Sequence, residues 1–439
     1  MSTPEPPPHT DRAPHTDPPV SSTADPPIRI VSVSDSESYL KWATQLLSSL
    51  PGVEAHVYLI DSPILPTPEQ ITHAIAGTAW AGHTIPVVDR TDLARIITDH
   101  RADIVLGAAT GPIVAQLFLT ANLHEHRPAL VSGLPGMGLP ASRKGMNYRR
   151  LMDAFITHSF AEVAQYTEVS ALTQVPCEIY LARLPMLRST GVPQLAAAAG
   201  AGAGADTGAG DSESLMHTAV PQTLVFAPQA KVPELLEDRE AIVATLAEFA
   251  SRHADSNAVI KMRSRPGEHE THHEQHSYVD ILHSLRARGV PGAERIGLGY
   301  GPLDEFLVPG AALVTVSSTA ALEAFDRGIP TLLISDFGYD RDLLNEAFAD
   351  SGATGTLAEV AAGAIGFPTS AWLAQNYFHA DNGRLRNHLE LLATRARAGQ
   401  LPDRRSAVWK QKRLLIRAEL RTMAPTPVVR AYRKFRTGR

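Results

Sequence analysis

The chain has 439 residues, of which 44% are hydrophobic, and at roughly 100–200 residues per domain this length predicts two domains. Its single cysteine, Cys177, excludes an intrachain disulfide and a cysteine zinc cluster. No apolar run approaches the length of about 18 residues that a membrane span needs, and the N-terminus lacks a basic-then-apolar secretion signal. We therefore expect a cytoplasmic protein. The formal net charge is −6.

The N-terminal half begins with a tail and continues with alternating strand and helix patterns. Residues 1–27 repeat PHTD in a Pro-rich context and are expected to be disordered. Buried strands are predicted, in chain order, at Ile28–Val33, Ala55–Ile60, Ile104–Leu106, Ala129–Val131 and Ala154–Thr157. Helices are predicted at Glu37–Leu50, Pro68–Ala79, Thr91–Asp99, Pro112–His124 and Ala161–Leu172. This order predicts a parallel-sheet domain over residues 28–187.

Polar residues and glycines follow several of these strands. Asp35 or Glu37, directly after the first strand, would lie at the cleft edge and could accept a proton from a hydroxyl group; capping of the next helix explains Asp35 equally well. The loops that could approach an acceptor contain Thr110, Gly111, Gly133 and Gly136. Neither loop is a dinucleotide fingerprint or a Walker loop, which disfavours an oxidoreductase.

A second patterned half follows a low-complexity linker, residues 188–220, that includes AAAAGAGAGADTGAG. Its domain is predicted over residues 221–369, with strands at Thr223–Phe226, Ala258–Met262, Leu313–Val316 and Thr331–Ile334. Its helices are predicted at Pro233–Arg252, Ser277–Arg288, Thr319–Arg327 and Asp342–Asp350. The sequence therefore predicts an α/β fold of two Rossmann-like, doubly wound parallel-sheet domains that face a cleft. Ligands would bind at the carboxyl ends of the strands.

A cationic loop leaves the second predicted strand of this half. Three cations at alternate positions would converge on one face, as a diphosphate or a sugar carboxylate requires. A solvated basic strand end is the alternative. The candidate donor-binding residues of this segment are Lys261, Arg263, Arg265, Gly267, Glu268 and His272.

The same loop contains His269-Glu-Thr-His-His273, which matches the zinc metalloprotease motif H-E-x-x-H. A catalytic zinc site needs an established helix and a third ligand, whereas this segment is polar and directly follows Pro266-Gly267. We therefore expect neither a metal site nor another cofactor.

The most informative segment runs from Ser317 to Thr331, SSTAALEAFDRGIPT. A buried strand ends at Ser317-Ser318-Thr319, where hydroxyl and backbone N–H groups at the start of a helix favour phosphate. Glu323 lies one turn further on. Helix capping by Ser or Thr is the alternative explanation.

This segment resembles the donor-binding segment of GT-B glycosyltransferases. It is most similar to the branch of CDP-glycerol transferases and bacterial sialyl- and polysialyltransferases, and it also resembles an uncharacterised actinobacterial glycosyltransferase group. The resemblance implies that Ser317, Ser318 and Thr319 meet donor phosphate and that Glu323 helps to hold the donor. Arg265-Pro266 stands where the sialyltransferases have His-Pro, which argues against a sialic-acid donor.

The resulting hypothesis is metal-independent transfer of a sugar from a nucleotide-activated donor to a glycan or lipid-linked acceptor in cell-envelope synthesis. Asp35 is the candidate general base. Two alternatives remain open, a non-hydrolysing nucleotide-sugar epimerase and a nucleotide-sugar-binding protein without catalysis.

The C-terminal part, residues 370–439, is expected to hold helices and a basic tail. Residues 401–439 carry 12 Lys and Arg against Asp403 and Glu419, a net charge of +10 that leaves −16 for the rest. A solvated helix across the body is the favoured interpretation, and peripheral contact with an anionic membrane remains open. No nucleic-acid partner is expected.

The predicted absence of a zinc site can be tested directly. Dialysed, tag-free protein should hold zinc far below one equivalent, because the segment around His269 lacks the preformed ligand set of a catalytic site. Metal analysis and activity in EDTA measure this. Stoichiometric zinc whose removal abolishes a hydrolytic activity would contradict the prediction.

Overall fold

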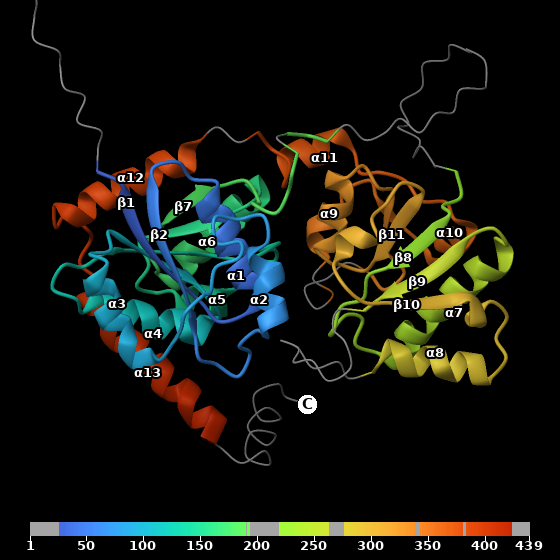
Figure 1. The fold of residues 1–439 in the computed structure, drawn as a ribbon, viewed down its shortest axis with the longest axis horizontal. Helices are drawn as coiled ribbons and strands as arrows, with labels where there is room; N and C mark the ends of the chain where they lie inside the picture. Colours follow the sequence, from blue (N-terminus) through green and yellow to red (C-terminus); the bar gives the residue numbers. More distant parts are fainter. Residues whose placement is uncertain are drawn as a thin grey trace, which may run out of the picture.

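The computed structural model describes residues 26–189, 191–193, 219–262, 276–338, 343, 345–380 and 383–423, with backbone only for 418–423. Within these residues the strands form two sheets, one of seven and one of six strands, and every pair of neighbouring strands is parallel. Each sheet is the centre of one α/β domain, and the domains lie side by side (Figure 1). The predicted fold class is confirmed.

The first sheet has the strand order β3-β2-β1-β4-β5-β6-β7. Its order reverses at the central pair, because β2 lies on one side of β1 and β4 lies on the other. The strands are β1 (Ile28–Ser34), β2 (Val53–Ile60), β3 (Val87–Val88), β4 (Ile104–Ala108), β5 (Ala129–Gly133), β6 (Ala154–Thr157) and β7 (Glu178–Leu181). The helices are α1 (Glu37–Ser48), α2 (Pro68–Ile75), η1 (Arg90–Asp92), α3 (Leu93–Asp99), α4 (Gly111–Asn122), α5 (Arg143–Tyr148) and α6 (Phe160–Thr173).

The second sheet repeats this arrangement with the order β10-β9-β8-β11-β12-β13, which reverses between β8 and β11. The strands are β8 (Thr223–Phe226), β9 (Asn257–Lys261), β10 (Ile296–Gly299), β11 (Ala311–Thr315), β12 (Thr331–Ile334) and β13 (Thr354–Gly355). The helices are α7 (Leu236–Arg252), α8 (Tyr278–Ala287), η2 (Ala293–Arg295), η3 (Leu303–Glu305), α9 (Ala320–Asp326), η4 (Glu346–Phe348) and α10 (Leu357–Ala362).

The central strands of both sheets lie where the apolar runs predict them, and the edges differ from the prediction. The edge strands β3, β7, β10 and β13 were not predicted, and two of them, β3 and β13, have only two residues each, too few to give an apolar run. The helix predicted over 342–350 is wrong, since only the short 3₁₀ turn η4 forms there among the described residues.

The C-terminal helices α11 (Ser370–Gln375), α12 (Arg384–Arg397) and α13 (Arg405–Met423) follow the second domain, and α12 and α13 return to the first (Figure 1). Two buried carboxylates hold them there. Arg397 donates to Asp103 with its Nη2 2.7 Å from Oδ2, and Arg404 lies 3.5 Å from Asp153. The Arg29 and Arg397 guanidinium groups lower the pKa of Asp103, although its burial alone would raise it. None of the helices in the described part of the chain is long and apolar enough to cross a membrane.

The junction between the domains combines an apolar cluster with one buried carboxylate. Leu184 and Leu187 of the first domain pack with side chains of α9, β12 and the α11 segment. Glu162, on α6, is 1% exposed and accepts hydrogen bonds from the Gly138 and His158 backbone N–H groups, each at 2.7 Å, and from the Tyr377 hydroxyl at 2.9 Å. Because three donors converge on this carboxylate, it ties a loop of the first domain to the C-terminal segment.

Gly133 at the end of β5 lies directly against the Trp42 indole. A Cβ atom at this position would come within 2.6 Å of Trp42 Cζ2 and 3.1 Å of the Ile156 carbonyl oxygen. Trp42 is fully buried and donates through Nε1 to His158 Nε2 at 2.9 Å, so the ring cannot move aside freely. The glycine is therefore explained by close packing.

We predict that Gly133→Ala lowers the free energy of unfolding by about 1–3 kcal/mol, because it overpacks a closed core. Urea unfolding measures the change. Gly191→Ala is the matched control, since a Cβ there meets nothing within 4 Å, and it should change stability by less than about 0.5 kcal/mol. Equal stability of the two variants would contradict the packing account.

Candidate functional site

Two cavities adjoin in the cleft between the domains and share the lining residues Lys261, Leu303 and Glu323. We call the smaller one, about 630 Å³, the switch-point cavity and the larger one, about 1000 Å³, the outer cavity. Both are lined by residues from the two domains.

The switch-point cavity lies where the strand order of the second sheet reverses. Its walls are residues 227–232, which follow β8, and residues 317–320, which follow β11. The first domain contributes residues 137–140, Leu134, Ser142 and Tyr166 on the opposite side. In open α/β sheets the loops on either side of such a reversal diverge and leave a crevice for ligands.

The serine pair predicted to meet phosphate lines this cavity, but its two members differ. Ser317 is 2% exposed and donates its hydroxyl to Gln229 Oε1 at 2.6 Å. Ser318 is half-buried, and its Oγ accepts from the Ala320 backbone N–H at 3.2 Å. The structure thus presents Ser318 and Thr319 to the cavity, whereas Ser317 also holds the neighbouring loop through Gln229.

Sequence reasoning missed the residues that hold this loop. Gln229 also donates to the Ser317 carbonyl oxygen at 3.1 Å, which closes a two-way bridge between the strand ends. Arg239, on α7 and 1% exposed, donates to the carbonyl oxygens of Ala230 and Pro233, each at 2.8 Å, and stacks over the Tyr278 ring at 4.9 Å. The sequence offered one signal for Arg239, because a charged residue there stands among the apolar positions that a helix buries.

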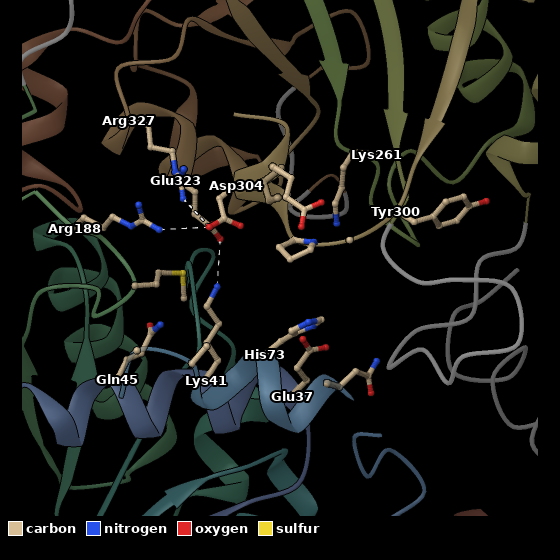
Figure 2. A pocket seen from close by; sticks show the side chains of 18 of the residues that line it. Glu37, Lys41, Gln45, His73, Arg188, Lys261, Tyr300, Asp304, Glu323 and Arg327 are labelled. Atoms are coloured by element: carbon tan, nitrogen blue, oxygen red, sulfur yellow. Dashed lines mark hydrogen bonds and ion pairs between the residues drawn. The ribbon is translucent and has the colours of Figure 1, made fainter. Parts of the chain in front are cut away.

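The outer cavity has polar walls. Figure 2 shows the Lys41 side chain reaching from α1 toward Glu323 on α9, where its Nζ lies 3.8 Å from the carboxylate. Asp304 lies within 3.5 Å of both Arg188 and Arg327. Carboxylates, cations and amides together line the space, and such groups can form hydrogen bonds with the hydroxyl groups of a ligand. The remaining polar wall residues are Glu37, Gln45, Glu69, Gln70, His73, Lys261, Tyr300, Glu305 and Asp326.

Asp35 follows β1 at the reversal of the first sheet. It is fully buried and lines neither cavity. One carboxylate oxygen, Oδ2, accepts from the Thr110 backbone N–H at 2.9 Å and from the Thr110 hydroxyl, and burial raises the pKa of the acid above its ordinary value of 3.8. Its role as a base stays a prediction, and Glu37 is the carboxylate of that segment that reaches the outer cavity.

The glycines assigned to the acceptor side prove to be close contacts within the protein. A Cβ on Gly111 would come within 2.6 Å of the Tyr148 ring, just as a Cβ on Gly133 would come close to the Trp42 ring. A Cβ on Gly136 would come within 2.8 Å of Thr319 Cγ2, so this loop of the first domain touches the segment that follows β11. Packing therefore accounts for these glycines, and none of the three lines a cavity wall.

The remaining candidates, Arg263, Arg265, Gly267, Glu268 and His272, lie outside the described residues, as does the segment His269–His273. Lys261, the last residue before that stretch, lines both cavities. Across the part of the chain that the structure describes, no three His, Cys, Asp or Glu side chains are grouped as metal ligands would be.

Two facing Rossmann-like domains with an interdomain cavity at a strand reversal are the architecture of the GT-B class. A family model described as "Putative glycosyltransferase (DUF6716)" matches residues 30–392, and the chain belongs to this family. Fold and family together support a GT-B-like glycosyltransferase. The narrower resemblance to CDP-glycerol and sialyltransferases stays a prediction.

Two solved structures support the fold. UDP-GlcNAc 2-epimerase from Methanocaldococcus jannaschii is 10% identical, with a TM-score of 0.50 over 83% of this chain and 99% of that one. MnaA of S. aureus, solved with UDP, is 11% identical, with a TM-score of 0.50 over 83% and 97%. The lipopolysaccharide galactosyltransferase WaaB is 10% identical, with a TM-score of 0.44 over 85% and 100%. No curated protein sequence matches the chain.

The buried carboxyl group of Asp35 gives a prediction about pH. Because its pKa is raised in the folded state, folding favours the protonated acid, and the wild type should lose stability relative to Asp35→Asn as pH rises above 3.8. The amide oxygen of Asn can still accept from Thr110, so the variant should fold.

Urea unfolding of both proteins between pH 4 and pH 8 measures the difference. A difference that does not change with pH, or one that changes in favour of the wild type, would show that Asp35 is not held as a destabilised carboxylate.

Proposed function

We propose that this protein transfers a sugar from a nucleotide-activated donor, bound by the second domain, to a glycan or lipid-linked acceptor on the first domain. The switch-point cavity carries the proposal, because it opens at the strand reversal of the second sheet and is faced by the first domain. We place the reaction in cell-envelope polysaccharide synthesis in the cytoplasm, as the resemblance of the Ser317–Thr331 segment implies.

The donor diphosphate would lie between the two walls of the switch-point cavity. Lys231 and Lys261 both line it and supply positive charge, and the Ser318 hydroxyl lies on the opposite wall. Arg263 and Arg265, which follow Lys261 in the sequence, would add charge. Glu323 lines both cavities, so its carboxylate can accept hydrogen bonds from the hydroxyl groups of a nucleotide sugar.

In the transfer step an acceptor oxygen forms a bond to the anomeric carbon while the bond from that carbon to phosphate oxygen breaks. The departing phosphate carries the negative charge, which the cations stabilise electrostatically, so a metal is not required. The acceptor proton passes to a carboxylate. Asp35 was the candidate from the sequence; its burial favours Glu37, on the wall of the outer cavity, for this role.

Two alternatives are separated by product analysis. MnaA of S. aureus was solved with UDP, which makes UDP-linked sugars the first donors to assay, followed by CMP-, CDP- and GDP-linked sugars. Release of nucleotide that depends on acceptor supports transfer. Conversion of the nucleotide sugar without acceptor would identify an epimerase, and binding without turnover would identify a non-catalytic binding protein.

We predict that Glu323→Gln weakens donor affinity roughly 10-fold or more, because a hydrogen bond to a charged group contributes about 1.5–3 kcal/mol. Isothermal calorimetry with the best donor measures the change. Lys41→Gln is the matched control, since it removes the ion pair of Glu323 and leaves the carboxylate in place. Equal losses in both variants would mean that the ion pair, and not contact with the donor, is what Glu323 provides.

A further inference from the structure

The outward face of α13 carries exposed apolar side chains among cations. Trp409 and Ile416 are 55% and 56% exposed and stand seven residues apart, which places them on one side of the helix. Lys412 and Arg413 lie between them, both exposed. The inward face is occupied, because Gln411 is 1% exposed and donates to the Tyr148 carbonyl oxygen at 3.0 Å.

The charge on this outward face is not neutralised by the described part of the protein. Lys410, Lys412, Arg413 and Arg417 are exposed, and no ion pair joins them to a described side chain. Arg405, at the start of the helix, does pair with Asp403, its Nε 3.0 Å from Oδ2. Four exposed cations therefore stand along α13, the helix that Figure 1 shows passing α4 and continuing beyond it.

We propose that the outward face of α13 docks this protein on an anionic membrane surface. Trp409 and Ile416 would enter the headgroup region, where an indole and a branched apolar side chain both gain from leaving water. The four cations would lie at the level of the lipid phosphates, each adding attraction to an anionic leaflet. Nucleic acid would use the cations but would leave the apolar pair exposed, so the membrane is the better match.

The docking face shares no residue with the cleft, and the proposal therefore stands or fails independently of glycosyl transfer. Arg404, at the base of the helix, is 8% exposed and paired with Asp153, so the helix is attached to the first domain on the side opposite the docking face. A membrane bound there would hold that domain at the bilayer while the outward face alone contacts lipid.

The test is flotation of the full chain with vesicles of phosphatidylcholine containing 30% phosphatidylglycerol, compared with pure phosphatidylcholine. The wild type should bind the anionic vesicles at least 10-fold more strongly, and rising salt should weaken the binding through screening. The pair Lys412→Glu and Arg413→Glu should reduce it at least 10-fold. The matched control, Arg252→Glu with Arg288→Glu, makes the same charge change on exposed residues of the second domain and should bind as the wild type does.

A third variant separates apolar insertion from charge. Trp409→Ser should reduce binding to anionic vesicles several-fold, and the loss should persist at high salt. Equal binding of the two vesicle types, equal losses in the α13 pair and its control, or unchanged binding by Trp409→Ser would each overturn the proposal. So would binding to duplex DNA or RNA in the absence of vesicle binding.

Discussion

The reversal of strand order at the centre of each parallel sheet is the constraint on which the rest of the structure depends. Parallel strands bring all their carboxyl ends to one edge, and the connections that leave two adjacent strands in opposite directions cannot cover the space between them. In the second domain that space lies between the ends of β8 and β11. The walls of the switch-point cavity come from the loops that follow these two strands, so the site is a consequence of topology before any side chain is considered.

The junction between the two domains contains a buried carboxylate, Glu162, among hydrogen-bond donors. Removing a carboxylate from water is costly unless hydrogen bonds replace its hydration, and the three donors around Glu162 meet that cost. One of them, the Gly138 N–H, belongs to a residue on the wall of the switch-point cavity. At the outer cavity, by contrast, Lys41 and Glu323 form a partly exposed ion pair, with 3.8 Å between the Lys41 Nζ and the Glu323 carboxylate. Such a pair is weak because solvent screens it.

The apolar runs of the sequence predict the central strands and the two-domain architecture, because a strand buried on both faces must be apolar throughout. They do not predict edge strands as short as β3 or β13, whose pairing is determined by the neighbouring strand. At the site, the segment from Ser317 to Glu323 could be placed from its position between a strand and a helix. The roles of Gln229 and Arg239 could not, since their hydrogen bonds join positions 88, 9 and 6 residues apart. The role of the glycines could not be predicted either. A close contact with another part of the protein and a close contact with a ligand both require a residue without Cβ.

The two sheets share the strand order around the reversal, yet the groups that line the crevice at the reversal differ between the domains. In the first domain the carboxyl group of Asp35, which follows β1, accepts from the N–H of Thr110, the N-cap residue of α4. A carboxyl group in this position occupies a backbone donor that a bound phosphate would otherwise engage. In the second domain the Ser318 N–H donates to Thr315 Oγ1 at 3.4 Å and the Ala320 N–H donates to Ser318 Oγ at 3.2 Å, so hydroxyl groups and not a carboxylate stand at this turn on the cavity wall. This difference supports the proposal that the nucleotide binds at the second domain and that the acceptor enters the polar outer cavity.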